Sequence, residues 1–460
     1  MLSLLHRAYW SAYLAWHLPG QARYPFRPAE QIERDRDRNA RRMAAYAYRW
    51  VPYYRETFAR LGLTPDDVRT FDDLKQLPLI GPDDLQEDPL RFVSTEVPLD
   101  TLKLTRSGGS TGRPRNIYTH LSSTYANVAY SERETSLHRQ IIGKGRRLVA
   151  MGLRPIDPTL SVRDKVRANA LWPRRADMWR GWQETPLRVD AAPAEILAAF
   201  DRRRPDIFYA YGSVMARVFA YAEREGVAFH APTIVRYASD ALPPTIRQLL
   251  TERYGIAVFS AYQATEAPRI GFECEAHRGY HNNIDLYPVR IVDEDGRDCP
   301  PGVVGEVVVS TLVGRGTILF NYRLGDRAAW LDEPCPCGRH LPLLSFIEGR
   351  TTDILYTADG RALVYNAYVQ LLREHPLVRQ YQLTQHALDR ITIALELAPG
   401  ADPAAVEREL RSALQPIFGS AMQFTFRFDG DLVRTGAGKL RYMRCAIEPP
   451  LTADARPDPH

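Results

Sequence analysis

Short apolar runs that alternate with helix-like segments constrain the fold of this chain most strongly, and the pattern begins near residue 145. The apolar runs lie at residues 148–151, 207–210, 234–237 and 256–259. Residues 213–225 and 244–254, which lie between such runs, have the composition of helices. Short buried strands that alternate with helices are typical of parallel sheets with crossover helices, so the sequence predicts an α/β core.

Three further regions flank this core. Residues 28–75 carry apolar positions at helical spacing, with a helix end just before Pro52, and predict a helical N-terminal layer. Residues 284–346 contain strand-like runs and turns, which predict a small β-barrel-like subdomain. The remainder predicts a compact α+β unit, in the order strand, helix at 367–374, strand pair, helix at 403–414 and final strand. We therefore expect a large N-terminal domain of residues 1–348 and a small, mobile C-terminal domain of residues 349–460.

The composition excludes two classes of protein. Hydrophobic residues make up 45% and charged residues 25% of the 460 residues, as in ordinary globular chains. No apolar run reaches the ~18 residues that suggest a membrane span. The chain is therefore neither disordered nor membrane-spanning. The 60 Lys and Arg residues against 55 Asp and Glu give a net charge of +5 without blocks of like charge, so we expect no nucleic-acid partner.

The N-terminus and the cysteines indicate the cellular location of the protein. The first 20 residues are apolar, but His6 and Arg7 interrupt what would be the hydrophobic core of a signal peptide. We interpret this segment as an amphipathic helix and expect no membrane partner. Five cysteines are an odd and sparse set, which does not predict a disulfide framework. We expect a cytoplasmic protein, and the sequence also allows a homodimer.

A Ser/Thr/Gly-rich segment, TRSGGSTGRP, spans residues 105–114. Its residues suit contact with a polyphosphate, through backbone N–H groups freed by glycine, through hydroxyls, or through charge. The candidates are Ser107, Gly108, Gly109, Ser110, Thr111, Gly112 and Arg113. The segment is not a Walker A motif, because the GxxxxGK[ST] spacing fails. The alternative interpretation is a flexible surface loop.

Four further motifs follow this segment in order: AYQATE at 261–266, NYRLGD at 321–326, EGRTTD at 348–353 and RTGAGK at 434–439. With VPYYR at 51–55 and LPLI at 77–80, they resemble the adenylate-forming superfamily of acyl-CoA ligases, adenylation domains and luciferases. The opening segment is similar to the phenylacetate-CoA ligase branch, which has adenylyltransferase-like relatives in capsule biosynthesis. The resemblance covers about residues 40–445.

The resemblance implies an ATP-dependent, AMP-forming ligase. A carboxylic acid attacks the α-phosphate of ATP to give acyl-AMP and pyrophosphate, and CoA then displaces AMP. The small domain is implied to rotate about residues 349–353 between the two steps. Residues 351–366 lack the usual stretch of the CoA ligases. The alternative acceptor is therefore an amine or a carrier protein, in natural-product or surface-polymer biosynthesis.

The resemblance also implies roles around the triphosphate. The segment at 105–113 holds the β- and γ-phosphates, with Arg113 in place of the usual lysine. Thr265 and Glu266 lie at the α-phosphate, where Glu266 binds Mg²⁺ as a hard oxygen ligand. Lys439 reaches both the substrate carboxylate and the α-phosphate and neutralises the charge of the transition state. The alternative for Lys439 is a solvated surface lysine.

Further residues are implied to bind the nucleoside. Asp326 accepts hydrogen bonds from the ribose hydroxyls, with Arg350 beside it. Tyr262 lies against the adenine ring, and Asp240 belongs to a turn near the adenine and acyl pockets. Each of three residues also has an alternative interpretation when it is taken alone. Glu266 is compatible with a helix-terminal acid, Asp326 with a turn residue, and Arg350 with a surface cation.

The acyl pocket is implied by position and by side-chain type. The residues that lie where the family builds this pocket are Tyr209, Tyr211, Gly212, Ser213, Ala238 and Pro268. Aromatic side chains in such a pocket suit a flat aryl or arylacetic acid. The alternative is that these aromatic residues belong to the hydrophobic core.

The last pattern is a set of cysteines and histidines. Cys274, Cys335 and Cys337 with one histidine supply the three thiolates and one imidazole of a closed, structural Zn²⁺ site. The set resembles zinc-carrying members of the same branch. Either His277 or His281 completes it. The alternatives are free cysteines, or a zinc-dependent binding module without catalytic activity.

Overall fold

The structure is a computed structural model, and it describes most of the 460 residues. The described residues are 2–106, 115–143, 148–154, 182–189, 191–347, 349–350, 355–359, 362–363, 368, 371–372, 375–428, 432–433, 440, 442–445 and 447. They form two compact units. The first contains the described residues up to 143 and residues 259–347, and the second contains those from 148 to 258 and from 349 onward. The expected division into domains of residues 1–348 and 349–460 stays a prediction.

The first unit begins with helices and continues with antiparallel strands. Its α-helices are α1 (Leu2–His17), α2 (Ala29–Trp50), α3 (Pro52–Leu61), α4 (Pro82–Glu87), α5 (Leu121–Tyr130) and α6 (Glu132–Ile142). Its 3₁₀ helices are η1 (Gln21–Phe26), η2 (Pro65–Asp67), η3 (Asp72–Gln76), η4 (Pro89–Phe92) and η5 (Leu99–Thr101). Its strands are β1 (Lys103–Arg106), β2 (Asn116–Thr119), β7 (Ala257–Tyr262), β8 (Gly271–Glu273), β9 (Tyr280–Asn282), β10 (Val289–Val292), β11 (Gly305–Val309), β12 (Tyr322–Ala328), β13 (Trp330–Leu331) and β14 (Leu343–Leu344).

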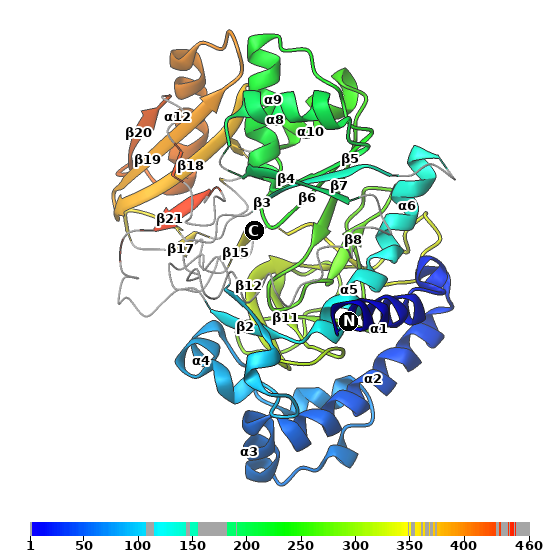
Figure 1. Ribbon diagram of the computed structural model, residues 1–460. Helices are drawn as coiled ribbons and strands as arrows, with labels where there is room; N and C mark the ends of the chain where they lie inside the picture. Colours follow the sequence, from blue (N-terminus) through cyan, green and yellow to red (C-terminus); the bar gives the residue numbers. More distant parts are fainter. Residues whose placement is uncertain are drawn as a thin grey trace. The chain divides into compact units, whose positions relative to one another are not determined.

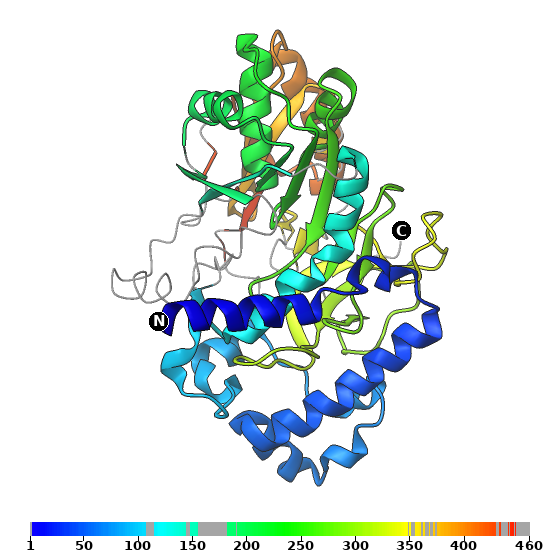
Figure 2. The ribbon, with the colours of Figure 1, turned by 45° about the vertical axis from the view of Figure 1, so that its right-hand side comes forward.

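The helical N-terminal layer is confirmed. Helix α2 buries a stripe that includes Ile32, Met43 and Ala47, and it ends at Val51 because the residue before Pro52 is kept out of the helical conformation. Helix α1 lies beside α5 (Figure 2). It packs Trp10 and Leu14 on α5, and the Trp10 ring stacks on Tyr125 with centroids 5.0 Å apart. Within the part of the chain that the structure describes, no helix is long and apolar enough to cross a membrane.

Two sheets of the first unit position the candidate site. Strands β13, β14, β9, β8 and β7 pair antiparallel in this order. Strands β10, β11 and β12 form a second antiparallel ladder, as expected for the β-rich region at 284–346. A core between the two includes Ile270, Leu286, Val289, Val307 and Leu344. The hairpin of β1 and β2 flanks the Ser/Thr/Gly-rich segment on both sides in sequence.

The second unit contains the predicted α/β core and the α+β region. Its helices are α8 (Pro193–Arg203), α9 (Gly212–Glu225), α10 (Pro244–Gln248), the π-helix η7 (Leu249–Arg253) and α12 (Pro403–Phe418). Its strands are β3 (Ala150–Arg154), β4 (Trp182–Arg188), β5 (Ile207–Ala210), β6 (Ile234–Ala238), β15 (Gly349–Arg350), β16 (Leu355–Tyr356), β17 (Ala362–Leu363), β18 (Val378–Ala387), β19 (Arg390–Leu397), β20 (Gln423–Arg427) and β21 (Met443–Cys445).

The parallel sheet expected from the apolar runs is confirmed. Strands β6, β5, β3 and β4 lie side by side and pair in parallel. One face carries Met151, Phe208 and Val235, which pack against Phe200 of α8 and Val218 of α9. Strand β4 was not predicted, because its sequence WQETPLR has two charges and a proline in place of an apolar run.

The C-terminal region has the predicted order of strand pair, helix and strand. Strands β18 and β19 pair antiparallel, and β21 and β20 add in parallel at the two edges. Helix α12 covers one face of these strands through residues such as Leu410 and Leu414 (Figure 1). The helix expected at 367–374 lies partly outside the described residues.

A buried arginine joins three separate segments of the first unit. Arg133 of α6 donates to both carboxylate oxygens of Asp285 at 2.7 and 2.8 Å, and to Asn283 Oδ1 at 3.0 Å. Its Nε donates to Gln21 Oε1 at 3.0 Å, and its guanidinium lies 3.9 Å from the centroid of the Tyr24 ring. Both charged side chains are almost fully buried. Their pairing therefore compensates a large cost of desolvation.

We predict that Arg133→Met lowers the free energy of unfolding by about 3–5 kcal/mol, because the Asp285 carboxylate stays buried without a counter-charge. The double variant Arg133→Met/Asp285→Leu should recover most of this loss. Arg224→Met, at an exposed ion pair with Glu225, is the matched control and should change little. Denaturant unfolding measures all three, and equal losses in Arg133→Met and Arg224→Met would contradict the prediction.

Candidate active site and metal centre

The Glu266 carboxylate is buried beside an arginine in the first unit. Its side chain is 4% exposed, and Arg115 Nε lies 3.2 Å from Glu266 Oε1. Burial and the neighbouring Glu266 raise the pKa of the Tyr322 hydroxyl well above its usual value. Thr265 and Glu266 lie in a tight turn after β7, which the backbone bonds between Ala264 and Ala267 close at 3.0 and 3.2 Å. An anionic oxygen is thus held next to a cation, and the binding of Mg²⁺ by Glu266 stays a prediction.

Two of the predicted nucleoside-binding residues contact each other. The Tyr262 hydroxyl at the end of β7 donates to Asp326 Oδ2 on β12 at 2.9 Å. Both side chains are buried, with 6% and 8% of their surface exposed. The hydroxyl therefore orients the carboxylate, and the pair joins the AYQATE and NYRLGD motifs in one unit.

Asp240 belongs to a turn of the second unit that closes the N-terminus of α9. Its carboxylate accepts the Ser213 backbone N–H at 3.2 Å and the Ser213 hydroxyl at 2.5 Å. A carboxylate is stabilised at a helix N-terminus by the unpaired N–H groups and by the helix dipole. Asp240 therefore holds this turn on α9. Its expected position near adenine stays a prediction.

The predicted acyl-pocket residues of the second unit cluster where strands end. Tyr209 is near the end of β5, Tyr211 and Gly212 begin α9, and Ala238 ends β6. The carboxyl ends of parallel strands are the usual place of ligand sites in α/β sheets. Burial and the nearby Asp240 raise the pKa of Tyr211 to about 12, so its hydroxyl stays protonated at neutral pH. Pro268 follows the Glu266 turn in the first unit.

Several predicted residues lie outside the described part of the chain. The residues without a described position are Ser107, Gly108, Gly109, Ser110, Thr111, Gly112, Arg113 and Lys439. Arg350 is described by its backbone only, as the second residue of β15. Their implied roles stay predictions.

Sequence reasoning missed Arg115. It follows the Ser/Thr/Gly-rich segment directly, and it contacts the Glu266 carboxylate from a distant part of the sequence. The run Arg113-Pro114-Arg115 was the available signal, because two arginines beside a phosphate-binding segment suit anionic partners. Sequence reasoning also missed Tyr322 of the NYRLGD motif, whose hydroxyl pKa is raised by burial and by Glu266.

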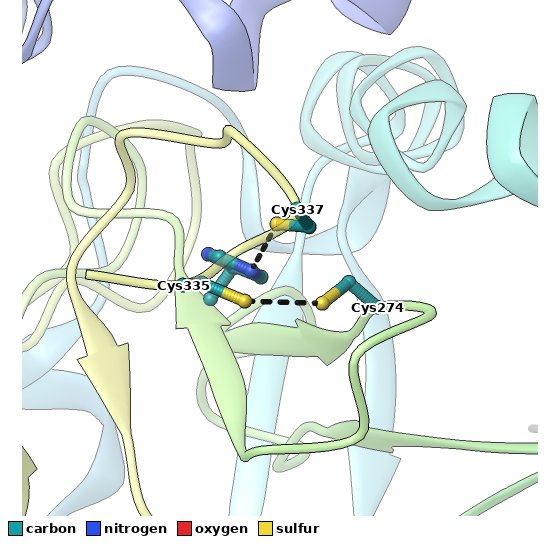
Figure 3. A group of neighbouring side chains, drawn as sticks. Cys274, Cys335 and Cys337 are labelled. Carbon is teal, nitrogen blue, oxygen red and sulfur yellow. Dashed lines mark hydrogen bonds between the residues drawn. The ribbon is translucent and has the colours of Figure 1, made fainter. Parts of the chain in front are cut away.

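The structure brings the three predicted cysteines together with one histidine (Figure 3). Cys274 Sγ lies 3.6 Å from Cys335 Sγ, and Cys337 Sγ lies 3.3 Å from His281 Nε2. All four potential ligand atoms lie within 4.8 Å of one another. Tetrahedral zinc with bonds of about 2.3 Å to sulfur places two sulfurs about 3.8 Å apart, so the set fits this metal.

The surroundings of the cluster suit a metal as well. The Nδ1 atom of His281 lies 3.2 Å from the Leu341 carbonyl, which orients the ring with Nε2 toward the cysteines. Backbone N–H groups of Ala276 and Arg339 donate to the Cys274 and Cys337 sulfurs at 3.5 Å. A hydrogen bond from the Cys274 thiol lowers the pKa of Cys337 well below its usual value, which favours a thiolate.

The structure separates the two histidines that the sequence left open. His281 is fully buried on β9 with its Nε2 atom at the cluster. His277 is 44% exposed on its side chain, and its Nδ1 lies 2.7 Å from Glu273 Oε1 instead. The geometry therefore favours His281 as the fourth ligand.

Curated proteins and solved structures resemble this chain over most of its length. A phenylacetate-coenzyme A ligase of Thermus thermophilus is 25% identical over 385 residues, which cover 81% of this chain and 82% of that protein. A phenylacetate-coenzyme A ligase of Aromatoleum evansii is 26% identical over 393 residues, covering 81% and 85%. Protein CapK of Staphylococcus aureus is 21% identical and covers 85% and 84%. No protein-family model matches the chain.

Among solved structures, a 2-hydroxyisobutyryl-CoA ligase in its postadenylation state has a TM-score of 0.72 at 19% identity, covering 92% of this chain and 91% of that one. A benzoate CoA ligase from Burkholderia xenovorans has a TM-score of 0.52 at 17% identity, covering 76% and 69%. The fold is that of the adenylate-forming ligases. The sequence relatives further confirm the resemblance to the phenylacetate-CoA ligase branch.

We predict about one zinc ion per chain in the purified protein, measured by elemental analysis. His281→Ala should lose the metal and lower the melting temperature, because it removes one of four ligands. His277→Ala is the matched control and should keep the metal. Loss of zinc from His277→Ala with retention in His281→Ala would contradict the assignment.

Proposed function

We propose that this protein is an AMP-forming ligase that activates an arylacetic acid as acyl-AMP and transfers the acyl group to CoA. The observation that carries the proposal is the buried Glu266 carboxylate paired with Arg115, in the same unit as the Tyr262 and Asp326 pair. Glu266, Tyr262 and Asp326 stand in two of the motifs that the family resemblance places around ATP. The similarity to several phenylacetate-CoA ligases supports the same reaction.

The first step forms the bond between acid and nucleotide. A carboxylate oxygen of the acid attacks the α-phosphorus of ATP, and the bond to the bridging oxygen breaks, so pyrophosphate leaves with its electron pair. The negative charge that gathers around the α-phosphorus needs nearby cations. Arg115 beside Glu266, and Lys439 from the RTGAGK motif, supply positive charge in this proposal. The segment at 107–113 binds the β- and γ-phosphates.

Magnesium and the nucleoside have specific residues in this account. The Glu266 carboxylate suits Mg²⁺ because it is a hard oxygen donor, and the bound ion would neutralise phosphate charge. Tyr262 keeps the Asp326 carboxylate in one orientation, which prepares two acceptor oxygens for the ribose hydroxyls. Arg350 lies beside this pair in the same scheme.

The second step exchanges AMP for the acceptor. The CoA thiolate attacks the acyl carbonyl carbon, the bond from this carbon to the phosphate oxygen breaks, and AMP leaves as the anion.

A specific observation favours a second class of acceptor. Residues 351–366 depart from the pattern of the CoA ligases, and Protein CapK is among the relatives. The second candidate is therefore acyl transfer to an amine or to a carrier protein.

The Cys/His cluster has a structural part in the proposal. Four protein ligands fill a tetrahedral zinc site and leave no position for substrate, so the ion would stabilise the turns around β8, β9 and β14. We also propose that the protein acts in the cytoplasm, where ATP and CoA are available.

We predict exchange of pyrophosphate into ATP that depends on an arylacetic acid such as phenylacetate. Lys439→Ala should lower the exchange rate by about 10²–10³-fold, because a charge at the developing transition state is removed. Lys75→Ala is the matched control, since Lys75 forms surface ion pairs with Asp72 and Asp298, and it should retain wild-type exchange. Absence of exchange with aryl, arylacetic and fatty acids, in protein that binds ATP, would contradict the proposal.

We predict that the wild-type protein forms phenylacetyl-CoA when CoA is added, as measured by mass spectrometry of the products. Hydroxylamine traps free acyl-AMP and serves as the control for the first step. Acyl-AMP formation without a thioester product would contradict transfer to CoA. An amide product when amines are added would then support the second class of acceptor.

A further inference from the structure

Three segments of the second unit meet at the N-terminus of α9. The first is Gly212 and Ser213, which begin the helix. The second is the turn of residues 238–242 at the end of β6, and the third is formed by Leu440 and Tyr442, which precede β21. Leu440 follows Lys439 directly, so their Cα atoms are separated by one peptide unit of about 3.8 Å. Contacts of Leu440 are therefore made one residue from the proposed catalytic lysine.

The turn of residues 238–242 lies very close to the helix. A Cβ atom on Gly212 would lie 2.4 Å from the Ala241 carbonyl oxygen, so this position requires glycine. Ser239 has a φ of 78°, a left-handed conformation that is costly for a residue other than glycine. The Asp240 carboxylate then accepts both the N–H and the hydroxyl of Ser213. A strained turn held this firmly presents the Ala241 carbonyl in one fixed direction.

Ser213 links the turn to the C-terminal segment through a single hydroxyl. The Oγ atom donates to Asp240 Oδ2 at 2.5 Å and accepts the Leu440 backbone N–H at 3.4 Å. A hydroxyl has one donor and two acceptor positions, so both bonds form at once. The Ser213 side chain is fully buried, and water therefore does not compete for these bonds.

Tyr442 makes the second link between the same segments. Its hydroxyl donates to the Ala241 carbonyl at 2.9 Å. Its ring packs on Tyr381 of β18 with centroids 5.1 Å apart, and its own carbonyl accepts the Leu383 N–H at 2.8 Å. Residue 442 is thus anchored in the C-terminal sheet while its hydroxyl reaches the turn.

We propose that Ser213 and Tyr442 are positioning residues for the adenylation step. They fix Leu440 and Tyr442 on the turn of residues 238–242, next in sequence to Lys439, which is proposed to neutralise charge while the carboxylate of the acid attacks the α-phosphorus. The inference rests on the proposed function, in which Lys439 serves the first half-reaction, and on the domain rotation between the two steps that the family resemblance implies. These contacts should therefore matter for acyl-AMP formation and not for acyl transfer.

The test uses Tyr442→Phe, which removes the hydroxyl and keeps the ring on Tyr381. Tyr254→Phe is the matched control, because it removes a hydroxyl bonded to Glu223 elsewhere in the same unit. Loss of one hydrogen bond should lower the rate of acid-dependent pyrophosphate exchange by about 2–10-fold in Tyr442→Phe alone. The rate of CoA acylation from synthetic phenylacetyl-AMP should equal that of the wild type in both variants. Ser213→Ala should reproduce the same split between the half-reactions.

Amide hydrogen exchange of the full chain provides a readout without turnover. Peptides that cover residues 440–445 should exchange faster in Tyr442→Phe than in the wild type and in Tyr254→Phe. Unchanged protection there would overturn the contact, and a loss confined to acyl transfer would overturn its role in adenylation. A wild-type protein without pyrophosphate exchange would instead refute the proposed function and the role that rests on it, while hydrogen exchange would still decide on the contact.

Discussion

The buried ion pair of Arg133 and Asp285 is the interaction on which the first unit depends. Through it, helix α6 holds the N-terminal residues Gln21 and Tyr24 and the segment that precedes β10. The same guanidinium donates to Asn283, whose side chain donates to the Arg269 carbonyl at 3.0 Å. Arg269 lies three residues after Glu266. The arginine thus fixes the backbone on one side of the candidate catalytic turn.

The Cys/His cluster restrains the other side of the same sheet. Cys274 follows β8, His281 lies on β9, and the bond from His281 to the Leu341 carbonyl reaches the segment before β14. Strand β9 pairs with β8, and β8 pairs with β7, which ends in Tyr262 and leads into Thr265 and Glu266. In the proposed function the cluster is a closed metal site, which stabilises the fold without taking part in the chemistry. The buried ion pair and the Cys/His cluster thus lie on either side of the candidate catalytic turn.

The sequence predicted those parts of the molecule whose signals are local. Apolar runs predicted β3, β5 and β6, and proline predicted the end of α2. Strand β4 was missed, because a strand with charged residues and a proline gives no periodic signal. Spacing alone left His277 and His281 equivalent, since each lies a few residues after Cys274. Strand β9 distinguishes them, because it directs His281 into the interior beside the cysteines and leaves His277 in a turn.

In the candidate active site, too, some residues could be predicted from local sequence and others could not. The motifs predicted Glu266, Asp326 and Tyr262 by their order along the chain. The partners of these groups depend on contacts between distant segments. The run Arg113-Pro114-Arg115 marks Arg115 as a candidate but does not identify Glu266 as its partner, and no local pattern links Ser213 to Leu440. Sequence motifs thus identify candidate substrate-binding groups, whereas the groups that orient them become evident only in the fold.

The most direct test of the account is the fate of oxygen from the acid. Phenylacetate labelled with ¹⁸O in both carboxyl oxygens is incubated with the protein, ATP, Mg²⁺ and CoA, and the nucleotide products are analysed by mass spectrometry. Attack of the carboxylate on the α-phosphorus predicts AMP that carries one ¹⁸O atom, together with unlabelled pyrophosphate. Formation of ADP with ¹⁸O in phosphate, or of AMP without label, would contradict an acyl-AMP intermediate.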